Sequence, residues 1–347
     1  MRKFGWFKGM VLICVMALSA TACSEWGSSD NSGGSSGKKG GLQKVAIGVT
    51  SLNSLHLWLI MAQDEQLMKP SGIKLDVVTF QNTGQIIPAL ISGSVNFGMA
   101  TPEQLFGAQE KQAGLKMVAS EVTNDPYQMI VRPNITSLEG LKGKTIGVTG
   151  IGASADYFTA KLLLKGHGLE EGRDYHFVNA GPPPQRATAL VKGQVDAVMS
   201  FPPDAQVMLS KGMKSIAQAS SLPNLHKIIM GSLISDQRWY SKNHDLAVKF
   251  MRGYLASVKW LYDPKNKAKA VADIAKDMKA STADATITYD TFITKLKASP
   301  LDGQIDPSYL TTTAKNAKSE GLKAAPSLDS LSSRYDNSLV KAAAKSD

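Results

Sequence analysis

The chain has 347 residues, a formal net charge of +10 and 43% hydrophobic residues, so it is long enough for two lobes with separate cores. A basic balance can indicate nucleic-acid binding. Here the lysines are dispersed and form no stripe interleaved with aromatic residues, which argues against that class. The two cysteines are Cys14 and Cys23, too few for a disulfide framework.

The N-terminus has the order of a secretory signal. Basic residues come first, then the apolar run 10–18, then small residues at 19–22, and then Cys23. The apolar run is too short to span a bilayer, which needs about 20 residues. The pattern predicts a signal peptide over 1–22 and lipidation of Cys23, although Ala20 stands where lipoproteins more often have leucine. An ordinary cleavage site beside an incidental cysteine is the alternative.

Residues 23–41 are rich in glycine and serine. Such a tract behaves as a flexible coil that cannot bury a core. It is the composition that a tether between a lipid anchor and a folded body needs. We therefore expect an exported protein held at the outer side of a membrane by its lipid.

The rest of the chain contains an internal repeat. Residues 47–50 (IGVT) recur at 146–149, and the pattern of 89–96 (ALISGSVN) recurs at 189–196 (ALVKGQVD). Strands, helices and glycine-bearing loops alternate in the same order between the two matches. The chain therefore contains two β-α-β-α-β units about a hundred residues apart.

Alternating strands and helices predict an α/β fold with two doubly wound lobes, each around a mostly parallel sheet. We expect the first lobe over 42–133 plus 228–347 and the second over 134–227, with the helical tail packed on the first lobe. In such sheets a ligand lies beyond the carboxyl ends of the strands, so two facing units predict a cleft between the lobes.

Three segments resemble a known family: 89–96, 137–148 (SLEGLKGKTIGV) and 190–197 (LVKGQVDA). The chain is similar to the substrate-binding lipoproteins of bacterial ABC importers, in the branch for nitrate, sulfonates, taurine and thiamine-pyrimidine precursors. The resemblance implies a type II periplasmic-binding-protein fold, a hinge of two crossings and closure on a small molecule. It also implies a monomer that docks on a permease driven by an ATPase.

The loop after the first strand carries Thr50, Ser51 and Asn53, which are suited to polar contacts with a ligand. Asn53 or Ser54 is also placed to cap the helix that follows. Trp58 in that helix is either a flat pocket wall or a core residue. His56 is more typical of a surface or core histidine than of a ligand contact.

Two more first-lobe segments follow strands. Gly84 and Gln85 lie after the second strand and would line the same cleft. Thr101, followed by Pro102 and Gln104, forms a capping box, and the helix that it starts would point its N-terminus at the cleft.

In the second lobe, residues 150–155 (GIGASA) open a helix after a strand. The pattern fits a dinucleotide fingerprint, but the next strand ends without the acidic residue that the fingerprint requires. A helix start with glycines also suits a smaller anion, and this reading selects Gly152, Ala153 and Ser154. Arg186 would face the cleft entrance, where it either pairs with an anionic group or is simply exposed to solvent.

Three aromatic residues lie near these loops. Phe201 could stack on a flat ligand, and Tyr127 and Tyr157 either close over the ligand or pack in the core. The aromatic residues favour a flat ring and the helix starts favour an anion. We prefer a small organic anion, such as a sulfonate or an aromatic carboxylate, over a thiamine-pyrimidine precursor.

Catalysis finds little support. The five histidines are scattered, no metal-binding or nucleophile motif occurs, and no cofactor is expected. The rival is an enzyme of the thiamine-pyrimidine synthase type on the same fold, but that class carries a cysteine-rich motif that this chain lacks. A surface sensor or adhesin without a permease is a third reading.

Overall fold

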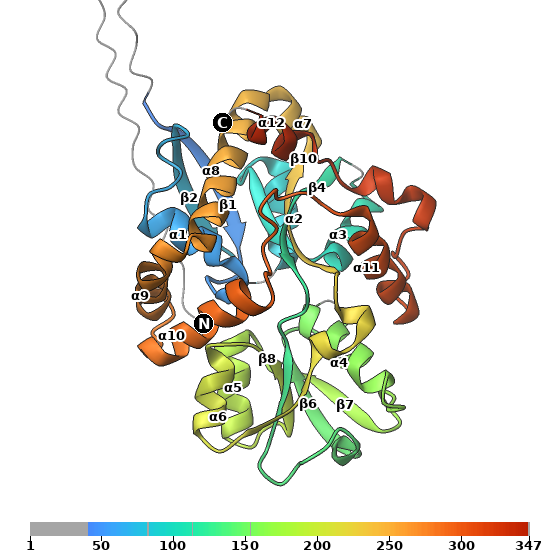
Figure 1. Cartoon of the computed structure of the whole chain (residues 1–347). Coiled ribbons are helices and arrows are strands. Elements are labelled where there is room, and N and C mark those ends of the chain that lie inside the picture. The colour runs from blue at the N-terminus through green and yellow to red at the C-terminus, as the bar shows by residue number, and fades with distance from the viewer. Residues whose placement is uncertain (1–40, 82, 113, 153, 346–347) are drawn as a thin grey trace, which may run out of the picture. The chain divides into compact units, whose positions relative to one another are not determined.

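The structure, a computed structural model, describes residues 41–81, 83–112, 114–152 and 154–345. The predicted signal peptide, Cys23 and nearly all of the predicted tether lie outside the described residues. Within the described residues the chain forms two lobes, each around a five-stranded sheet (Figure 1).

The strands of the first sheet are, in spatial order, β2 (Ile73–Thr79), β1 (Gln43–Val49), β3 (Phe97–Ala100), β10 (Ile229–Asp236) and β4 (Leu115–Thr123). Those of the second sheet are β7 (Tyr175–Asn179), β6 (Lys144–Val148), β8 (Ala197–Ser200), β5 (Gln128–Val131) and β9 (Lys214–Gln218). The two sheets thus have equivalent strand orders, which confirms the repeat found in the sequence.

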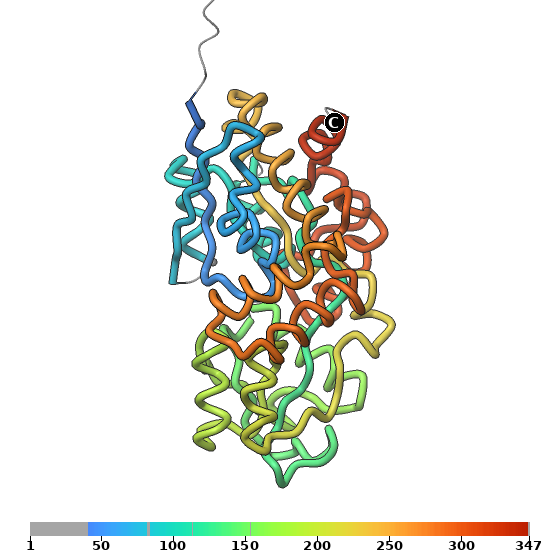
Figure 2. Tube along the Cα trace, turned by 60° about the vertical axis from the view of Figure 1, so that its left-hand side comes forward, coloured from blue at the N-terminus to red at the C-terminus, as the bar shows by residue number. Residues whose placement is uncertain are grey.

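The helices are α1 (Leu57–Asp64), α2 (Thr83–Ser92), α3 (Pro102–Gln109), α4 (Ala155–Lys165), α5 (Pro183–Val191), α6 (Asp204–Ser210), α7 (Gln237–Lys242), α8 (His244–Tyr262), α9 (Lys267–Asp277), α10 (Thr282–Tyr289), α11 (Pro307–Ser319) and α12 (Ser338–Ala344). Helix α8 packs against α1 and α12, and α11 packs against α3 and β10, so these tail helices lie against the first lobe (Figure 2).

The repeated sequence segments build the same local structure in each lobe. Gly93 and Gly193 adopt φ values of +76° and +72° just after α2 and α5, a conformation that glycine enters without steric cost. Asn96 Oδ1 then accepts a hydrogen bond of 2.9 Å from a backbone amide of β1, and Asp196 Oδ2 accepts one of 3.1 Å from a backbone amide of β6. The short polar residue therefore fixes where the third strand meets the first.

Four strands of each sheet run in the same direction, as expected of a mostly parallel sheet, and one strand runs against them. Strand β10 runs antiparallel to β3 and β4, and β5 runs antiparallel to β8 and β9. Both strands begin where the chain arrives from the other lobe, at the edge where the parallel strands end. Because β5 starts at Gln128, the first crossing falls at 124–127, before the boundary expected at 133/134.

The first crossing is tied to the second lobe by Asp125, which is buried. Its Oδ1 accepts a hydrogen bond of 2.8 Å from the Tyr127 amide, and its Oδ2 accepts one of 2.5 Å from Thr159 Oγ1 in α4. Burial raises the pKa of the Asp125 carboxyl to about 6. The folded protein therefore holds a proton on this group at a pH where an unfolded aspartate has lost it.

Gly98 in β3 lets α2 approach the first sheet closely. A Cβ at Gly98 would lie 2.5 Å from Ile86 Cγ2 and 3.2 Å from Leu90 Cδ1. We expect Gly98→Ala to lower the free energy of unfolding in urea by about 1–3 kcal/mol, because the packed core must shift. Gly107→Ala in α3, where a Cβ meets nothing within 4 Å, should instead raise it by about 0.5–1 kcal/mol. Equal effects of the two substitutions would contradict this packing.

Asp125 also predicts a pH dependence. Since its pKa is higher in the folded state than the value of about 3.9 of an unfolded aspartate, its contribution to stability is complete below pH 4 and is lost as the pH rises to 6. Urea titrations of Asp125→Asn should lack this loss, which is on the order of 2–3 kcal/mol.

The control is Asp306→Asn at the start of α11, where a hydrogen bond from Ser308 lowers the carboxyl pKa. That variant should still lose stability between pH 4 and 6, because Asp125 is intact. It should lack the small gain in the free energy of unfolding that Asp306 contributes as the pH rises through its lowered pKa. An Asp125→Asn profile parallel to that of the wild type between pH 4 and 7 would refute the assignment.

Candidate functional site

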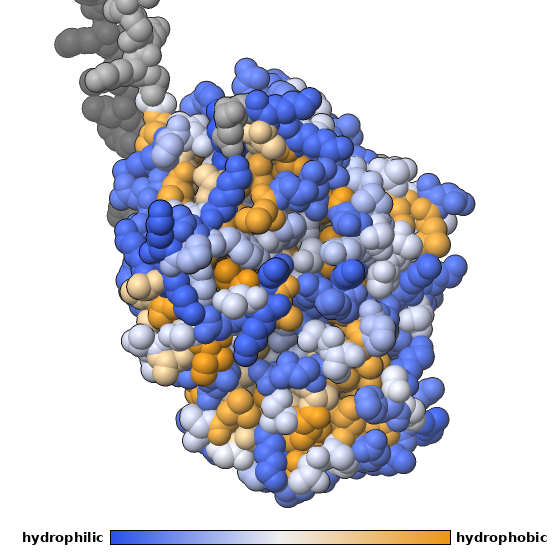
Figure 3. Space-filling view, in the orientation of Figure 1, coloured by the Kyte–Doolittle hydropathy of each residue, from blue (hydrophilic) through white to orange (hydrophobic). Residues whose placement is uncertain are grey.

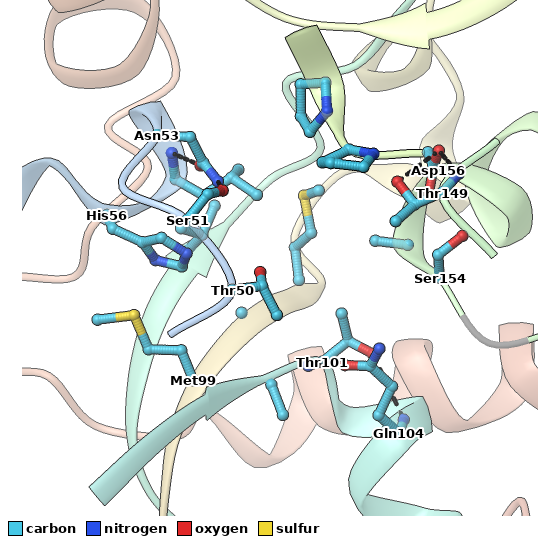
Figure 4. Close-up of a pocket in the computed structure, with 18 of the residues that line it drawn as sticks. Thr50, Ser51, Asn53, His56, Met99, Thr101, Gln104, Thr149, Ser154 and Asp156 are labelled. Carbon is cyan, nitrogen blue, oxygen red and sulfur yellow. Dashed lines mark hydrogen bonds between the residues drawn. The ribbon is translucent and has the colours of Figure 1, made fainter. Parts of the chain in front are cut away.

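A cavity of about 390 Å³ lies where the carboxyl ends of the strands of both sheets meet (Figure 4). Its lining comes from the loops after β1, β2, β3, β6 and β8, from the first turns of α2, α3, α4 and α5, and from β4, β10 and the crossing before β5. The lining residues are Thr50, Ser51, Asn53, Leu55, His56, Gln81, Gly84, Met99, Ala100, Thr101, Gln104, Glu121, Val122, Tyr127, Thr149, Gly150, Ser154, Ala155, Asp156, Pro182, Pro183, Phe201, Met230 and Gly231. The volume is in the range of small-molecule sites.

The loop after β1 forms one polar wall. Asn53 caps the short helix η1 (Ser54–His56), because its Oδ1 accepts a hydrogen bond of 2.9 Å from the Leu55 amide. Its Nδ2 donates to Ser51 Oγ at 3.0 Å, so the loop is held by its own side chains. Ser54 Oγ donates to the carbonyl of Pro202 in the second lobe, which joins the two walls.

The start of α3 forms the floor near β3. Thr101 Oγ1 accepts a hydrogen bond of 3.4 Å from the Gln104 amide, and Gln104 Oε1 accepts one of 3.1 Å from the Thr101 amide. This reciprocal pair is the capping box expected from the sequence, and it is confirmed. It turns the N-terminal end of α3 toward the cavity.

The second lobe contributes the loop before α4. Ser154 Oγ donates to the Gly150 carbonyl at 2.8 Å and accepts from the Gly150 amide at 3.1 Å, which closes the loop on itself. Asp156 follows in the first turn of α4, and its Oδ2 accepts hydrogen bonds from the amide and the hydroxyl of Thr149 at 2.7 and 3.2 Å. Figure 4 shows Thr149, Ser154 and Asp156 together on this wall.

Arg186 lies behind that wall and not at the cleft entrance, so its expected place is wrong. Its side chain is 1% exposed, and its Nη1 lies 3.1 Å from Asp156 Oδ2. It also donates to the hydroxyl of Thr149 and to the carbonyl of Met199. The guanidinium neutralises a buried carboxylate of the wall and does not line the cavity.

A second buried carboxyl lines the cavity from the first lobe. Glu121 in β4 is fully buried, and its Oε1 accepts a hydrogen bond of 2.8 Å from Trp58 Nε1. His56 Nδ1 lies 2.7 Å from the same oxygen. Sequence reasoning missed Glu121 and gave His56 a structural role, although a glutamate in the middle of the apolar strand 115–123 was a signal that could have been followed.

The aromatic residues divide into two groups. Tyr127 and Phe201 both line the cavity, with ring centroids 5.0 Å apart, and burial raises the pKa of the Tyr127 hydroxyl well above its usual range. Trp58 is instead a core residue, edge-on to Tyr254 at 4.8 Å. Tyr157 packs on Phe177 outside the cavity lining.

The expected site residues are therefore only partly brought together. Those that line the cavity are Thr50, Ser51, Asn53, Gly84, Thr101, Tyr127, Ser154 and Phe201. Those placed elsewhere are Trp58, Gln85, Gly152, Tyr157 and Arg186, and Ala153 lies outside the described residues. Gln85 accepts a hydrogen bond of 3.0 Å from the Gln81 amide and so shapes the loop instead. Ligand contact by the eight lining residues stays a prediction.

Within residues 41–345, leaving aside 82, 113 and 153, no group of three or more His, Cys, Asp or Glu residues is placed to hold a metal ion. No helix described by the structure is both long and apolar enough to cross a membrane.

Known proteins match most of the described chain. A family model described as NMT1/THI5 like matches residues 53–268. The taurine-binding periplasmic protein of Escherichia coli (strain K12) is 25% identical over 249 residues, which cover 65% of this chain and 72% of that protein.

Two solved structures share the fold. The ligand-binding component of an ABC-type import system from Staphylococcus aureus, with zinc bound, has a TM-score of 0.72 at 18% identity, over 88% of this chain and 100% of that chain. The alkanesulfonate-binding protein SsuA from Xanthomonas axonopodis pv. citri, bound to MOPS, has a TM-score of 0.66 at 20% identity, over 82% of this chain and 95% of that chain. At these identities the two structures support only the fold. They confirm the two-lobed periplasmic-binding-protein fold that the sequence predicts.

Breaking the buried ion pair between Arg186 and Asp156 should destabilise the protein more than breaking an exposed one. Arg186→Met leaves Asp156 buried without its cation and should lower the free energy of unfolding by about 3–5 kcal/mol. Arg132→Met removes an exposed ion pair with Asp196, 3.8 Å apart, and should cost less than about 1 kcal/mol. Urea unfolding measures the free energy of unfolding of both variants. A loss below about 1 kcal/mol for Arg186→Met would contradict a buried ion pair between Arg186 and Asp156.

Proposed function

The chain belongs to the NMT1/THI5-like family, and we propose that it is the extracytoplasmic solute-binding component of an ABC-type importer. The observation that carries this proposal is the cavity between the lobes, to which both sheets contribute the carboxyl ends of their strands. A solute in that position contacts both lobes at once. Binding energy can therefore favour a closed arrangement of the lobes that a permease could recognise.

The lobes are connected in a way that suits this role. The chain crosses between the sheets at 124–127 and again between β9 and β10, so two connections join the lobes. We assign the first lobe to the segments that build the first sheet and the tail helices, and the second lobe to the segments that build the second sheet.

We propose a small organic solute, with a sulfonate as the first class to test. Two relatives are named for taurine and alkanesulfonate binding, which supports this class. The first turns of α3 and α4 face the cavity, and helix N-termini favour anionic groups. Because Arg186 is occupied by Asp156, an acidic group would be held by backbone amides and hydroxyls and not by a guanidinium.

Two alternatives are a different class of solute and an enzymatic function. Tyr127 and Phe201 in the lining suit a flat ring, so a thiamine-pyrimidine precursor is the second class. An enzyme on this fold finds less support, because the only cysteines, Cys14 and Cys23, precede the described lobes and no cysteine-rich motif exists.

We also propose export by the signal over 1–22, anchoring through lipid on Cys23, and a monomer that acts with a permease and its ATPase. On the face shown in Figure 3, hydrophobic residues lie in several separate groups among hydrophilic ones. Large exposed hydrophobic side chains such as Leu42, Val207 and Leu301 come from different elements. Scattered residues of this kind do not call for a second copy of the chain.

Solute binding predicts thermal stabilisation. At a solute concentration of a hundred times its Kd, the free energy of unfolding should rise by about 2.7 kcal/mol, because only the folded protein binds. We expect this rise in a thermal-shift screen with one of three classes: sulfonates, aromatic carboxylates or aminopyrimidines.

A variant that blocks the cavity shows whether the binding is at this site. Gly84 is exposed and lines the cavity, so Gly84→Trp should weaken binding at least tenfold in calorimetry. Gly41→Trp adds the same side chain where a Cβ meets nothing within 4 Å, outside the lining, and should bind as the wild type does. If no class of solute stabilises the protein, the proposed function is contradicted. If Gly84→Trp and Gly41→Trp bind the solute equally well, the solute does not bind in this cavity.

A further inference from the structure

Glu121 has one oxygen that the protein satisfies and one that it does not. Oε1 accepts the hydrogen bond from Trp58 and is in contact with His56. Oε2 is buried and has no hydrogen-bond partner among the described residues. A buried carboxylate oxygen without a donor costs free energy, so a partner from outside the chain is expected.

Oε2 lies beside residues that line the cavity. Glu121 lines the cavity, as do its neighbour Val122 and, on the adjoining strand β10, Gly231. A Cβ built on Gly231 would lie 3.6 Å from Glu121 Oε2. Glycine at position 231 therefore keeps a side chain out of contact with this oxygen.

The carboxyl is also held in one orientation. Trp58 belongs to the core, edge-on to Tyr254 and Phe250, and its indole cannot follow a rotating carboxyl. His56 approaches the same oxygen from η1. With Oε1 held from two sides, Oε2 must keep its direction, which is the preorganisation that a binding group needs.

The charges of the lining point to the same kind of partner. Of the two acidic residues among the described lining residues, Asp156 is neutralised by Arg186 from behind, and no lysine or arginine lines the cavity. His56 is the one basic side chain there, and it is engaged with Oε1. A solute that brought only acidic groups would leave Glu121 Oε2 unpaired.

We propose that Glu121 Oε2 accepts a hydrogen bond from a nitrogen of the solute, so that the protein selects solutes carrying an amine or amino group over those without one. The inference rests on the proposed function, whose solute classes it narrows to their amino-bearing members. Among sulfonates it favours an aminoalkanesulfonate, with the amine at Glu121 and the acidic group toward the helix starts of α3 and α4.

The experiment compares matched probes by calorimetry on the purified protein. The pairs are 2-aminoethanesulfonate with ethanesulfonate, 4-(aminomethyl)benzoate with 4-methylbenzoate, and 4-aminopyrimidine with pyrimidine. We expect the amino member of the pair that binds to do so about 10- to 100-fold more tightly, the usual effect of a hydrogen bond to a charged group. This comparison needs no variant.

Glu121→Gln then tests the residue itself. Because Trp58 donates to the position of Oε1, the glutamine oxygen should occupy that position and the amide nitrogen should replace Oε2. The cavity would then present a donor where it had an acceptor. The amino probe should lose at least tenfold in affinity while its partner without the amine keeps or gains affinity, a change in preference that a loss of folding cannot produce.

The matched control is Asp273→Asn in α9. Asp273 Oδ2 also lacks a hydrogen-bond partner, but the residue does not line the cavity. Its affinities should equal those of the wild type. Thermal unfolding by circular dichroism without solute reports whether each variant is folded.

The outcomes separate the two proposals. If a probe pair binds with equal affinities, or if Glu121→Gln leaves the preference unchanged, the proposed function stands and the role of Glu121 is overturned, with a bound water left as the partner of Oε2. If no probe of any pair binds to the wild type, the proposed function is overturned and the inference with it.

Discussion

The exchange of strands between the two sheets is the constraint on which the rest of the structure depends. Strand β5 follows β4 of the first sheet but belongs to the second, and β10 follows β9 of the second sheet but returns to the first. Neither lobe can complete its sheet without the segment that leaves the other. The chain must therefore cross twice, and the loops at the carboxyl ends of the parallel strands face a common cavity.

Because polar side chains hold the loops of the cavity walls, a charged group buried there needs a partner of opposite charge within the protein. The cavity walls are built from strand ends and helix starts, where a polar side chain such as Asp156 is useful for holding a loop. Once buried, its carboxylate needs a counter-charge, because an unpaired buried ion is strongly destabilising. Arg186 supplies that charge from α5 and at the same time holds Thr149 and the end of β8. Arg186, a candidate ligand contact in the sequence, thus stabilises the cavity wall instead of contacting the solute.

The fold could be predicted from the sequence because its signals are local and repeated. Gly93 with Asn96 and Gly193 with Asp196 each specify a helix end and the strand that follows, within a few residues. Thr101 could be recognised in the same way, since a capping box spans only four positions. The direction of β5 and β10 could not, because it depends on where the chain crosses and not on the composition of the strands.

The candidate site was predicted less well for a related reason. Loop residues after strands, such as Ser51 and Phe201, were found because parallel sheets place such loops at one edge. Whether a side chain on a helix faces the cavity or the core depends on the rotation of the helix, and both Trp58 and Arg186 turned inward. Glu121 meets His56 across 65 positions of sequence, and no pattern in either segment indicates the other.

The two carboxyl groups of the cavity show how the lobes differ although the same sequence pattern recurs in both. Asp156 is neutralised by its own lobe, so the second lobe presents a wall whose charge is already balanced. Glu121 is only half satisfied by its own lobe, because its Oε2 has no hydrogen-bond partner among the described residues. If a solute nitrogen completes Glu121, the first lobe discriminates between solutes. The second lobe then contributes the N-terminal end of α4, where backbone amides favour an acidic group.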